Sequence, residues 1–243
     1  EKLGEGGMGE VYRALDGLTR QTVALKRVRI GTDATQAGSS VDLLNSEGLR
    51  LALAQEFHIL ASLRHPNIIS VLDYGFDEER QPYYTMDFLA EAQNLLEAGR
   101  GQNLPTRLNL LVQTLEATAY LHRRGIIHRD LKPANVLMAA GEVKVLDFGL
   151  SQAHDQVTVS ENEVAGTLAY VAPEVLRGEH PGTASDLYAI GIIAYELLVG
   201  HHPFDTGNIG ELINSTLFGE PDLSPLHRLL AGEDPFEIVI DES

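Results

Sequence analysis

Cysteine is absent from the 243-residue sequence, which excludes disulfide scaffolds, thiolate metal sites and cysteine nucleophiles. Basic residues are also scarce, because 18 lysines and arginines stand against 35 aspartates and glutamates, for a formal net charge of −17. We therefore expect binding neither to nucleic acid nor to an anionic membrane surface. The longest apolar run, Leu187–Val199, is too short to cross a bilayer of about 30 Å and contains Glu196, so it predicts a buried core helix.

The sequence begins without an initiator Met and without a charged and then apolar leader. These absences predict no secretory signal and no membrane segment in this span, and they suggest a piece of a longer protein. A chain without cysteine is compatible with a reducing compartment, and we expect a cytoplasmic location. What is present is a globular composition, with 44% hydrophobic residues and enough length for a substantial core.

The residue pattern divides the chain into a sheet-rich part and a helical part. Before about Met86, alternating segments rich in Val, Ile and Tyr, such as Thr22–Val28 and Ile68–Tyr74, predict strands. One predicted helix, Glu47–Leu63, interrupts these strands. The composition of Gly31–Ser40, just before that helix, is typical of a flexible loop.

From Pro105 onward the apolar spacing becomes helical, and Gly125 predicts the end of the first long helix. The apolar residues predicted to share one face of that helix are Leu108, Leu111, Val112, Leu115, Ala119 and Leu121. The pattern as a whole predicts an α+β fold, with a smaller sheet lobe before a larger helical lobe. Most of the acid excess lies in the second lobe, where it is either an ordinary solvated surface or an attraction for cationic substrates.

Residues 4–11 carry the first motif that suggests chemistry, a G-x-G-x-x-G-x-V arrangement from Gly4 to Val11. A dinucleotide site would need a helix after these glycines, whereas the turn at Asp16-Gly17 and a further strand predict hairpins. Glycines at a hairpin tip allow backbone N–H groups to approach a polyphosphate closely. An ordinary glycine-rich turn is the structural alternative.

Lys26 is one of only four lysines in the chain and lies on the strand that follows the glycine hairpin. An exposed strand lysine is usually a solvated residue. Beneath a glycine-rich hairpin it could instead contact phosphates, provided that an acid holds it in place. Glu56, on the predicted helix, is the candidate acid.

The third motif is the most specific, because several polar residues recur in a fixed order. It reads H-R-D-L-K-P-A-N over His128–Asn135, then a short predicted hairpin through Ala140-Gly141, then D-F-G from Asp147. Two acids and an amide near one point would suit Mg²⁺, which prefers oxygen ligands. The alternative, in which these residues only make turns, does not account for their joint spacing.

With these motifs the sequence resembles the eukaryotic-type protein kinases, and its wording is most similar to their bacterial serine/threonine members. The resemblance runs from Leu3 to about Phe204. Its later matches are Gly166-Thr167, Ala172-Pro173-Glu174, Asp186 with Gly191, and His202-Pro203-Phe204. It implies a bilobal fold with an antiparallel N-lobe over 1–86 that contains one main helix, a hinge over 87–89, and a mostly helical C-lobe over 90–243.

The resemblance also implies an activity, Mg²⁺-ATP-dependent transfer of the γ-phosphoryl group to serine and threonine hydroxyls of protein substrates. The catalytic residues it implies are Asp130, which would accept the substrate proton, Lys132 on the γ-phosphate, and Lys26 held by Glu56. Asn135 and Asp147 would hold Mg²⁺. The implied nucleotide-binding residues are Leu3, Gly4, Gly6, Gly7, Gly9, Val11, Ala24, Lys26, Met86, Asp87, Leu89 and Leu137.

Regulation is implied at Arg129, which in such kinases usually contacts a phosphate of the activation loop. The other implied regulatory residues are Thr158, Ser160, Glu163 and Thr167, of which Thr158 and Ser160 are candidate phosphosites. A carboxylate at Glu163 could pair with Arg129 without modification. An exposed ion pair is worth only about 0.2–1 kcal/mol, so this pair would be a weak bias, and a solvated acidic loop is the alternative.

One departure from the family concerns Glu174, whose carboxylate usually pairs with an arginine near the end of the domain. Ile238 stands where that arginine is expected, so we expect Glu174 to be unpaired and the second lobe to be less stable. Two other functions stay open: a non-catalytic ATP-binding scaffold of the same fold, and a kinase of small molecules. The intact catalytic residues argue against the scaffold, and Ala172-Pro173-Glu174 after Gly166-Thr167 argues against the small-molecule kinase.

Overall fold

The computed structural model describes residues 1–6, 9–28, 57–79, 81–147 and 166–232. The described chain falls into two compact units, residues 1–90 and residues 91–147 with 166–232. Because each unit has its own elements and its own core, each is described by itself. The lobe boundaries expected from the sequence, at 86 and 90, stay a prediction.

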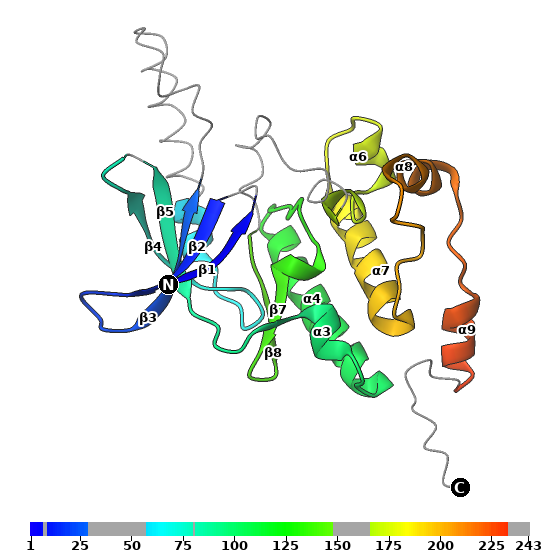
Figure 1. The fold of residues 1–243 in the computed structure, drawn as a ribbon, viewed down its shortest axis with the longest axis horizontal. Coiled ribbons are helices and arrows are strands. Elements are labelled where there is room, and N and C mark those ends of the chain that lie inside the picture. Colours follow the sequence, from blue (N-terminus) through cyan, green and yellow to red (C-terminus); the bar gives the residue numbers. More distant parts are fainter. Residues whose placement is uncertain (7–8, 29–56, 80, 148–165, 233–243) are drawn as a thin grey trace, which may run out of the picture. The chain divides into compact units, whose positions relative to one another are not determined.

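The first unit is built on a five-stranded sheet in which every neighbouring pair is antiparallel (Figure 1). Its order is β1-β2-β3-β5-β4. The strands are β1 (Lys2–Gly6), β2 (Gly9–Leu15), β3 (Thr22–Val28), β4 (Val71–Phe76) and β5 (Pro82–Asp87). The glycine motif therefore joins two antiparallel strands, as the sequence predicts, and no helix follows it directly. This pairing rules out the dinucleotide-binding interpretation.

Two predictions for this unit have mixed outcomes. The strand over Thr22–Val28 is confirmed with the same bounds, whereas the strand predicted over Ile68–Tyr74 is wrong at its start, because β4 begins at Val71. Ile68 and Ile69 are both buried, so this stretch lacks the alternation of a paired strand. Of the helix predicted over Glu47–Leu63, residues 57–62 are helical and the part up to 56 lies outside the described residues, as does the loop predicted over Gly31–Ser40.

The second unit is mostly helical. Its elements are β6 (Gln93–Asn94), α3 (Leu95–Gly99), α4 (Leu104–Arg123), the 3₁₀ turn η1 (Pro133–Asn135), β7 (Val136–Ala139), β8 (Glu142–Val145), α6 (Pro173–Leu176), α7 (Thr183–Val199), α8 (Ile209–Phe218) and α9 (Ser224–Leu230). The helix α7 packs against α3, α4 and α9, and α4 also packs against β8 (Figure 1). The α+β class expected from the sequence is confirmed.

The buried helix predicted over Leu187–Val199 is α7, which begins four residues earlier. The hydroxyl of Ser185 accepts a hydrogen bond from the backbone N–H of Gly182 at the start of the helix. Gly200 ends it with φ of 94°, a left-handed conformation in which glycine carries no Cβ penalty. None of the described helices is long and apolar enough to cross a membrane.

The face predicted to be apolar on α4 is confirmed at Leu111 and Leu121, which are buried, and is wrong at its other four residues. Leu108, Val112 and Leu115 are exposed, and Ala119 is exposed with them. The buried residues of the helix are Arg107, Leu110, Leu111, Thr114, Ala117, Thr118 and Leu121. The hidden threonines satisfy their hydroxyls within the helix, because each donates to the carbonyl four residues earlier, at 2.9 Å. Thr114 and Thr118 can be buried because they bond to their own helix. The buried face of α4 therefore differs from the face that apolar spacing predicts.

The core role of α7 predicts a contrast between two of its apolar residues. Ile193 is fully buried, whereas Leu187 is 53% exposed. We expect Ile193→Ala to lower the free energy of unfolding by about 2–5 kcal/mol, because the substitution leaves a cavity. Leu187→Ala is the matched control and should change it by less than about 0.5 kcal/mol. Urea denaturation of both variants measures the difference, and equal losses would contradict the assignment of Ile193 to the core.

Candidate active site

The hairpin of β7 and β8 brings two of the predicted site residues to one place. Asn135 precedes β7 and Asp147 follows β8, and the strands are paired from Val136 with Val145 onward. The backbone N–H of Leu146 donates to the carbonyl of Asn135 at 2.9 Å, which extends the pairing by one step. Residues twelve apart in sequence therefore lie at the same open end of the hairpin.

Asp130 is the centre of a hydrogen-bonded cluster in the loop before this hairpin. Its Oδ2 accepts a hydrogen bond from Nδ2 of Asn135 at 2.9 Å and lies 3.1 Å from Nζ of Lys132. Nδ2 of Asn135 also donates to the backbone carbonyl of Asp130 at 2.7 Å. Neither Oδ1 of Asp130 nor Oδ1 of Asn135 has a hydrogen-bond partner among the described residues. The structure therefore holds one oxygen of the carboxylate and leaves the other available.

Lys132 connects this cluster to a segment more than thirty residues away. Its ammonium group donates to the hydroxyl of Thr167 at 3.1 Å while it pairs with Asp130. The motif residues Asp130, Lys132 and Asn135 and the predicted regulatory residue Thr167 are thus brought together. The alternative in which these residues only form turns does not explain a lysine shared between two separate segments.

His128 supports the loop from inside the core. Its side chain is fully buried, and Nε2 lies 2.9 Å from the carbonyl oxygen of Leu146, next to Asp147. Burial lowers the pKa of His128, because a charged imidazole would be desolvated there. The neutral ring must then carry its proton on Nε2 in order to donate to that carbonyl.

The sequence assigned no role to Asp186, which the structure shows to be central to the loop. Its buried carboxylate accepts hydrogen bonds from the backbone N–H groups of His128 at 2.8 Å and Arg129 at 2.9 Å. It also lies 2.7 Å from Nε2 of His122, near the end of α4. Arg129 has φ of 70°, an uncommon conformation for a residue with a side chain. The Asp186 carboxylate stabilises that conformation by binding its N–H group.

On the sheet of the first unit, four predicted nucleotide-binding residues share one face. Val11 is paired with Lys26, Ala24 is paired with Met86, and Ala24 and Lys26 are two residues apart on β3. Lys26 is only 4% exposed, and lysines are seldom so deeply buried unless their charge is paired. Its expected partner, Glu56, lies outside the described residues.

Gly9 begins β2 at the point where the glycine hairpin approaches β3. Its φ is 134°, and a Cβ built on it would lie 1.9 Å from the carbonyl oxygen of Arg27. No other residue fits there without movement of the backbone. The glycine at the end of the motif is therefore required by the sheet itself, whatever else the hairpin binds.

The remaining predicted residues lie on known elements or outside the described chain. Leu3, Gly4 and Gly6 are on β1, Asp87 ends β5, Leu89 follows it, and Leu137 is on β7. Gly7, Glu56, Thr158, Ser160 and Glu163 lie outside the described residues, together with Phe148 and Gly149 of the D-F-G motif. Arg129 is among the described residues and Glu163 is not, so the pairing between them stays a prediction.

The expectation that Glu174 has no partner is corrected. Its Oε1 accepts a hydrogen bond from the hydroxyl of Ser185 at 2.6 Å, near the first turn of α7. A neutral donor replaces the arginine that the resemblance suggested. No local pattern indicates this contact, because Glu174 and Ser185 belong to different elements.

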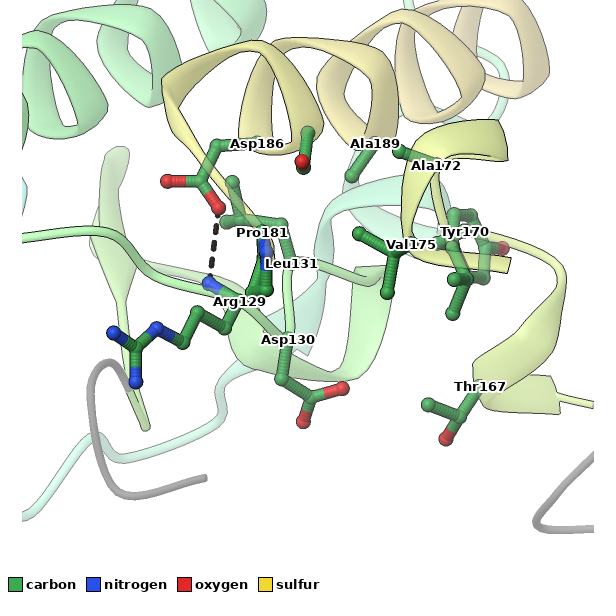
Figure 2. Close-up of a pocket in the computed structure, with 12 residues that line it drawn as sticks. Arg129, Asp130, Leu131, Thr167, Tyr170, Ala172, Val175, Pro181, Asp186 and Ala189 are labelled. Atoms are coloured by element: carbon green, nitrogen blue, oxygen red, sulfur yellow. Dashed lines mark hydrogen bonds between the residues drawn. The ribbon is translucent and has the colours of Figure 1, made fainter. Parts of the chain in front are cut away.

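A pocket of about 70 Å³ opens beside the Asp130 cluster (Figure 2). Asp130 and Thr167 lie at one end of the view, and Asp186 and Ala189 lie at the other. Its remaining wall is largely apolar and includes Tyr170, Val171 and Val175. The pocket therefore places the carboxylate of Asp130 beside a largely apolar wall, and enzyme pockets that bind small groups are commonly lined in this way.

Comparison with known proteins agrees with this geometry. A family profile described as a protein kinase domain matches residues 1–221. The chain belongs to the protein kinase family.

Two relatives of this kinase domain illustrate its similarity to bacterial enzymes. A probable serine/threonine-protein kinase of Streptomyces coelicolor is 38% identical over 212 residues, which cover 83% of this chain and 30% of the relative. The serine/threonine-protein kinase PrkC of Bacillus subtilis is 36% identical over 208 residues, which cover 84% of this chain and 30% of the relative. The chain therefore spans about a third of the length of these relatives.

The hydrogen bonds to Asp186 predict that an isosteric amide cannot replace it. Asp186→Asn would set an NH₂ group against an N–H donor, and one buried donor would lose its acceptor. We expect the free energy of unfolding to fall by about 1–3 kcal/mol, measured by urea denaturation. Asp205→Asn is the control, because Asp205 is exposed and its bond from the N–H of Gly207 survives the change. An unchanged stability of Asp186→Asn would contradict the role of the carboxylate.

The burial of His128 predicts how it responds to pH. Its pKa in the folded state is below the ordinary value of about 6.5, so as the pH falls the unfolded chain takes up a proton at this residue before the folded protein does. The unfolded state then binds more protons, and the contribution of His128 to stability is lost as the pH falls below about 6.5. Proton–nitrogen NMR of ¹⁵N-histidine-labelled protein, assigned with His128→Tyr, measures this directly. A His128 signal that becomes imidazolium near pH 6.5 would contradict the prediction.

Proposed function

We propose that this kinase domain transfers the γ-phosphoryl group of ATP to serine and threonine hydroxyls of protein substrates, itself included, with Mg²⁺ as cofactor. One observation carries the proposal. Asp130 has one carboxylate oxygen held by Lys132 and Asn135, and its other oxygen has no partner among the described residues. A carboxylate fixed in this way can accept a proton from an incoming hydroxyl.

In this proposal Asp130 orients the substrate hydroxyl and accepts its proton as the oxygen attacks the γ-phosphorus. Lys132 has a second function, because its ammonium group lies 3.1 Å from Oδ2 of Asp130. It stabilises negative charge on the transferring group. Phosphoryl transfer depends mainly on positioning and charge neutralisation, so a rigid cluster of this kind supplies most of what the reaction needs.

The residues at the end of the β7–β8 hairpin fit Mg²⁺ chemically. Asn135 uses its Nδ2 to bind Asp130, which leaves its amide oxygen available, and Asp147 adds a carboxylate. Mg²⁺ is usually bound through one or two carboxylates together with substrate phosphates, so two protein ligands suffice. The ion would neutralise negative charge on the phosphates.

For the nucleotide we propose the sheet face of the first unit. Lys26, held by Glu56, would contact the α- and β-phosphates, and the backbone of the glycine hairpin would cover them. Val11 and Ala24 would contact the adenine ring. Met86 would close the back of the pocket, and the backbone of Asp87 and Leu89 would bind the purine edge. The burial of Lys26 supports a role that needs a paired and oriented charge.

For regulation we propose that Arg129 receives a negative charge from the segment that contains Thr158, Ser160 and Glu163. The hydroxyl of Thr167, farther along the chain, accepts a hydrogen bond from Lys132. A phosphate brings about −1.5 to −2 charges and would order the segment more strongly than a carboxylate does. We also propose a cytoplasmic location, because the co-substrate ATP is supplied there.

The proposal predicts that Asp130→Asn abolishes phosphoryl transfer and spares nucleotide binding. We expect the rate to fall by about 10²–10⁴-fold, because the amide cannot accept the proton. The assay follows radiolabelled phosphate from Mg-ATP to dephosphorylated casein, with ATP affinity measured by calorimetry and Asp205→Asn as the control. Excess EDTA should remove the activity of the wild-type chain.

The same experiment separates the alternatives. A wild-type chain that binds ATP and transfers no label to protein would be a scaffold. Label that reaches a small molecule and not protein would indicate a small-molecule kinase. Equal transfer by the wild type and Asp130→Asn would disprove the role of Asp130.

A further inference from the structure

The segment Thr167–Val171 forms the wall of the pocket that faces Asp130. Thr167, Tyr170 and Val171 line the pocket together with Asp130 (Figure 2). The segment is a tight turn, because the N–H of Tyr170 donates to the carbonyl of Thr167 at 3.2 Å and the N–H of Val171 donates to that of Leu168 at 3.1 Å. Its position therefore decides what an incoming protein side chain meets beside Asp130.

His202 reaches this turn from the loop after α7. Its Nε2 lies 3.0 Å from the carbonyl oxygen of Ala169, and its ring meets the ring of Tyr170 edge-on, with centroids 6.1 Å apart. On its other side, Nδ1 lies 3.1 Å from the backbone nitrogen of Phe204 and 2.9 Å from the carbonyl oxygen of the same residue. A proton on Nε2 allows the ring to donate to the carbonyl of Ala169. The histidine thus joins two segments that are 33 residues apart in sequence.

A second contact ties the same turn to α7 itself. The hydroxyl of Tyr170 donates to Oε2 of Glu196 at 2.5 Å. Burial raises the pKa of Tyr170, with the bond to Glu196 as a further cause, so the phenol remains a neutral donor. Two successive residues of the turn, Ala169 and Tyr170, are therefore held from outside the turn.

We propose that His202 is a positioning residue for the protein substrate. It does not line the pocket, and it acts by fixing the carbonyl of Ala169 and the ring of Tyr170, which set the wall opposite Asp130. This inference rests on the proposed function. It assigns a role in protein-substrate binding to the His202-Pro203-Phe204 motif, which the catalytic residues leave unexplained. ATP binding should not depend on it.

Steady-state kinetics of His202→Ala and His202→Gln test the inference. Dephosphorylated casein is varied at saturating Mg-ATP, and Mg-ATP is varied at fixed casein. We expect His202→Ala to lower kcat/KM for casein by about tenfold and to change KM for ATP by less than twofold, because a small displacement of a positioning group has a large effect on turnover. His202→Gln should recover most of the loss, since its amide can donate to Ala169.

His201→Ala is the matched control. His201 is the exposed neighbour, and it does not contact the turn in the described structure. It should behave as the wild type. Equal losses for casein and ATP, no loss in His202→Ala, or no recovery in His202→Gln would overturn the inference, because each outcome points to general destabilisation or to no role.

Hydrogen–deuterium exchange of residues 166–172 separates a failure of this inference from a failure of the proposed function. It needs no activity, so it is informative even if the wild type transfers no phosphate to protein. We expect the amides of Tyr170 and Val171 to exchange faster in His202→Ala and to return toward the wild-type rate in His202→Gln. Unchanged exchange in His202→Ala would overturn the tether between His202 and the turn.

Discussion

The loop that contains Asp130 depends on the hydrogen bonds that the buried carboxylate of Asp186 accepts from the loop's backbone. A buried charge is costly unless hydrogen bonds replace its lost hydration. Here the replacements are two consecutive backbone N–H groups, of His128 and Arg129, and the ring of His122. Two adjacent N–H groups can point at one carboxylate only if the backbone bends sharply, and Arg129 provides the bend with its left-handed φ. The charge and the strained backbone therefore stabilise each other, and Asp130 follows directly in the geometry they set.

The helix α7 also holds the pocket wall, through an acid near its other end. Asp186 lies in the first turn, where the helix dipole favours a negative charge. Glu196 lies near the last turn, where the dipole does not favour it, and the hydroxyl of Tyr170 compensates. The catalytic loop and the wall opposite it are thus both positioned by one buried helix. A rigid core element is a better reference for such a site than either loop would be.

The sequence predicted elements whose residues obey a simple period and missed those whose neighbours lie far along the chain. β3 has its predicted bounds because its valines favour a strand, although burial does not alternate strictly, since Val23 and Ala24 are both buried. On α4 the apolar period pointed to the exposed face, because buried Thr114 and Thr118 bond to their own helix. In the site, Asp130, Lys132 and Asn135 were found because their spacing is local. The contacts of Asp186 with the loop span 57 and 58 residues, and that of His202 with Ala169 spans 33, so no local pattern could reveal them.

The charge balance of the chain explains why the site needs its particular cations. A protein with a net charge of −17 repels a polyphosphate at long range, and it has only four lysines. Two of them, Lys2 and Lys144, pair with surface carboxylates, Lys2 with Glu10 and Lys144 with Glu142. The other two are Lys26, which is buried in the sheet, and Lys132, which pairs with Asp130 in the loop. In the proposed function, backbone N–H groups of the glycine hairpin and a divalent ion would supply further positive charge beside the nucleoside triphosphate. Short-range, directional groups of this kind allow an acidic protein to bind an anion, because they act where the repulsion of distant acids is screened.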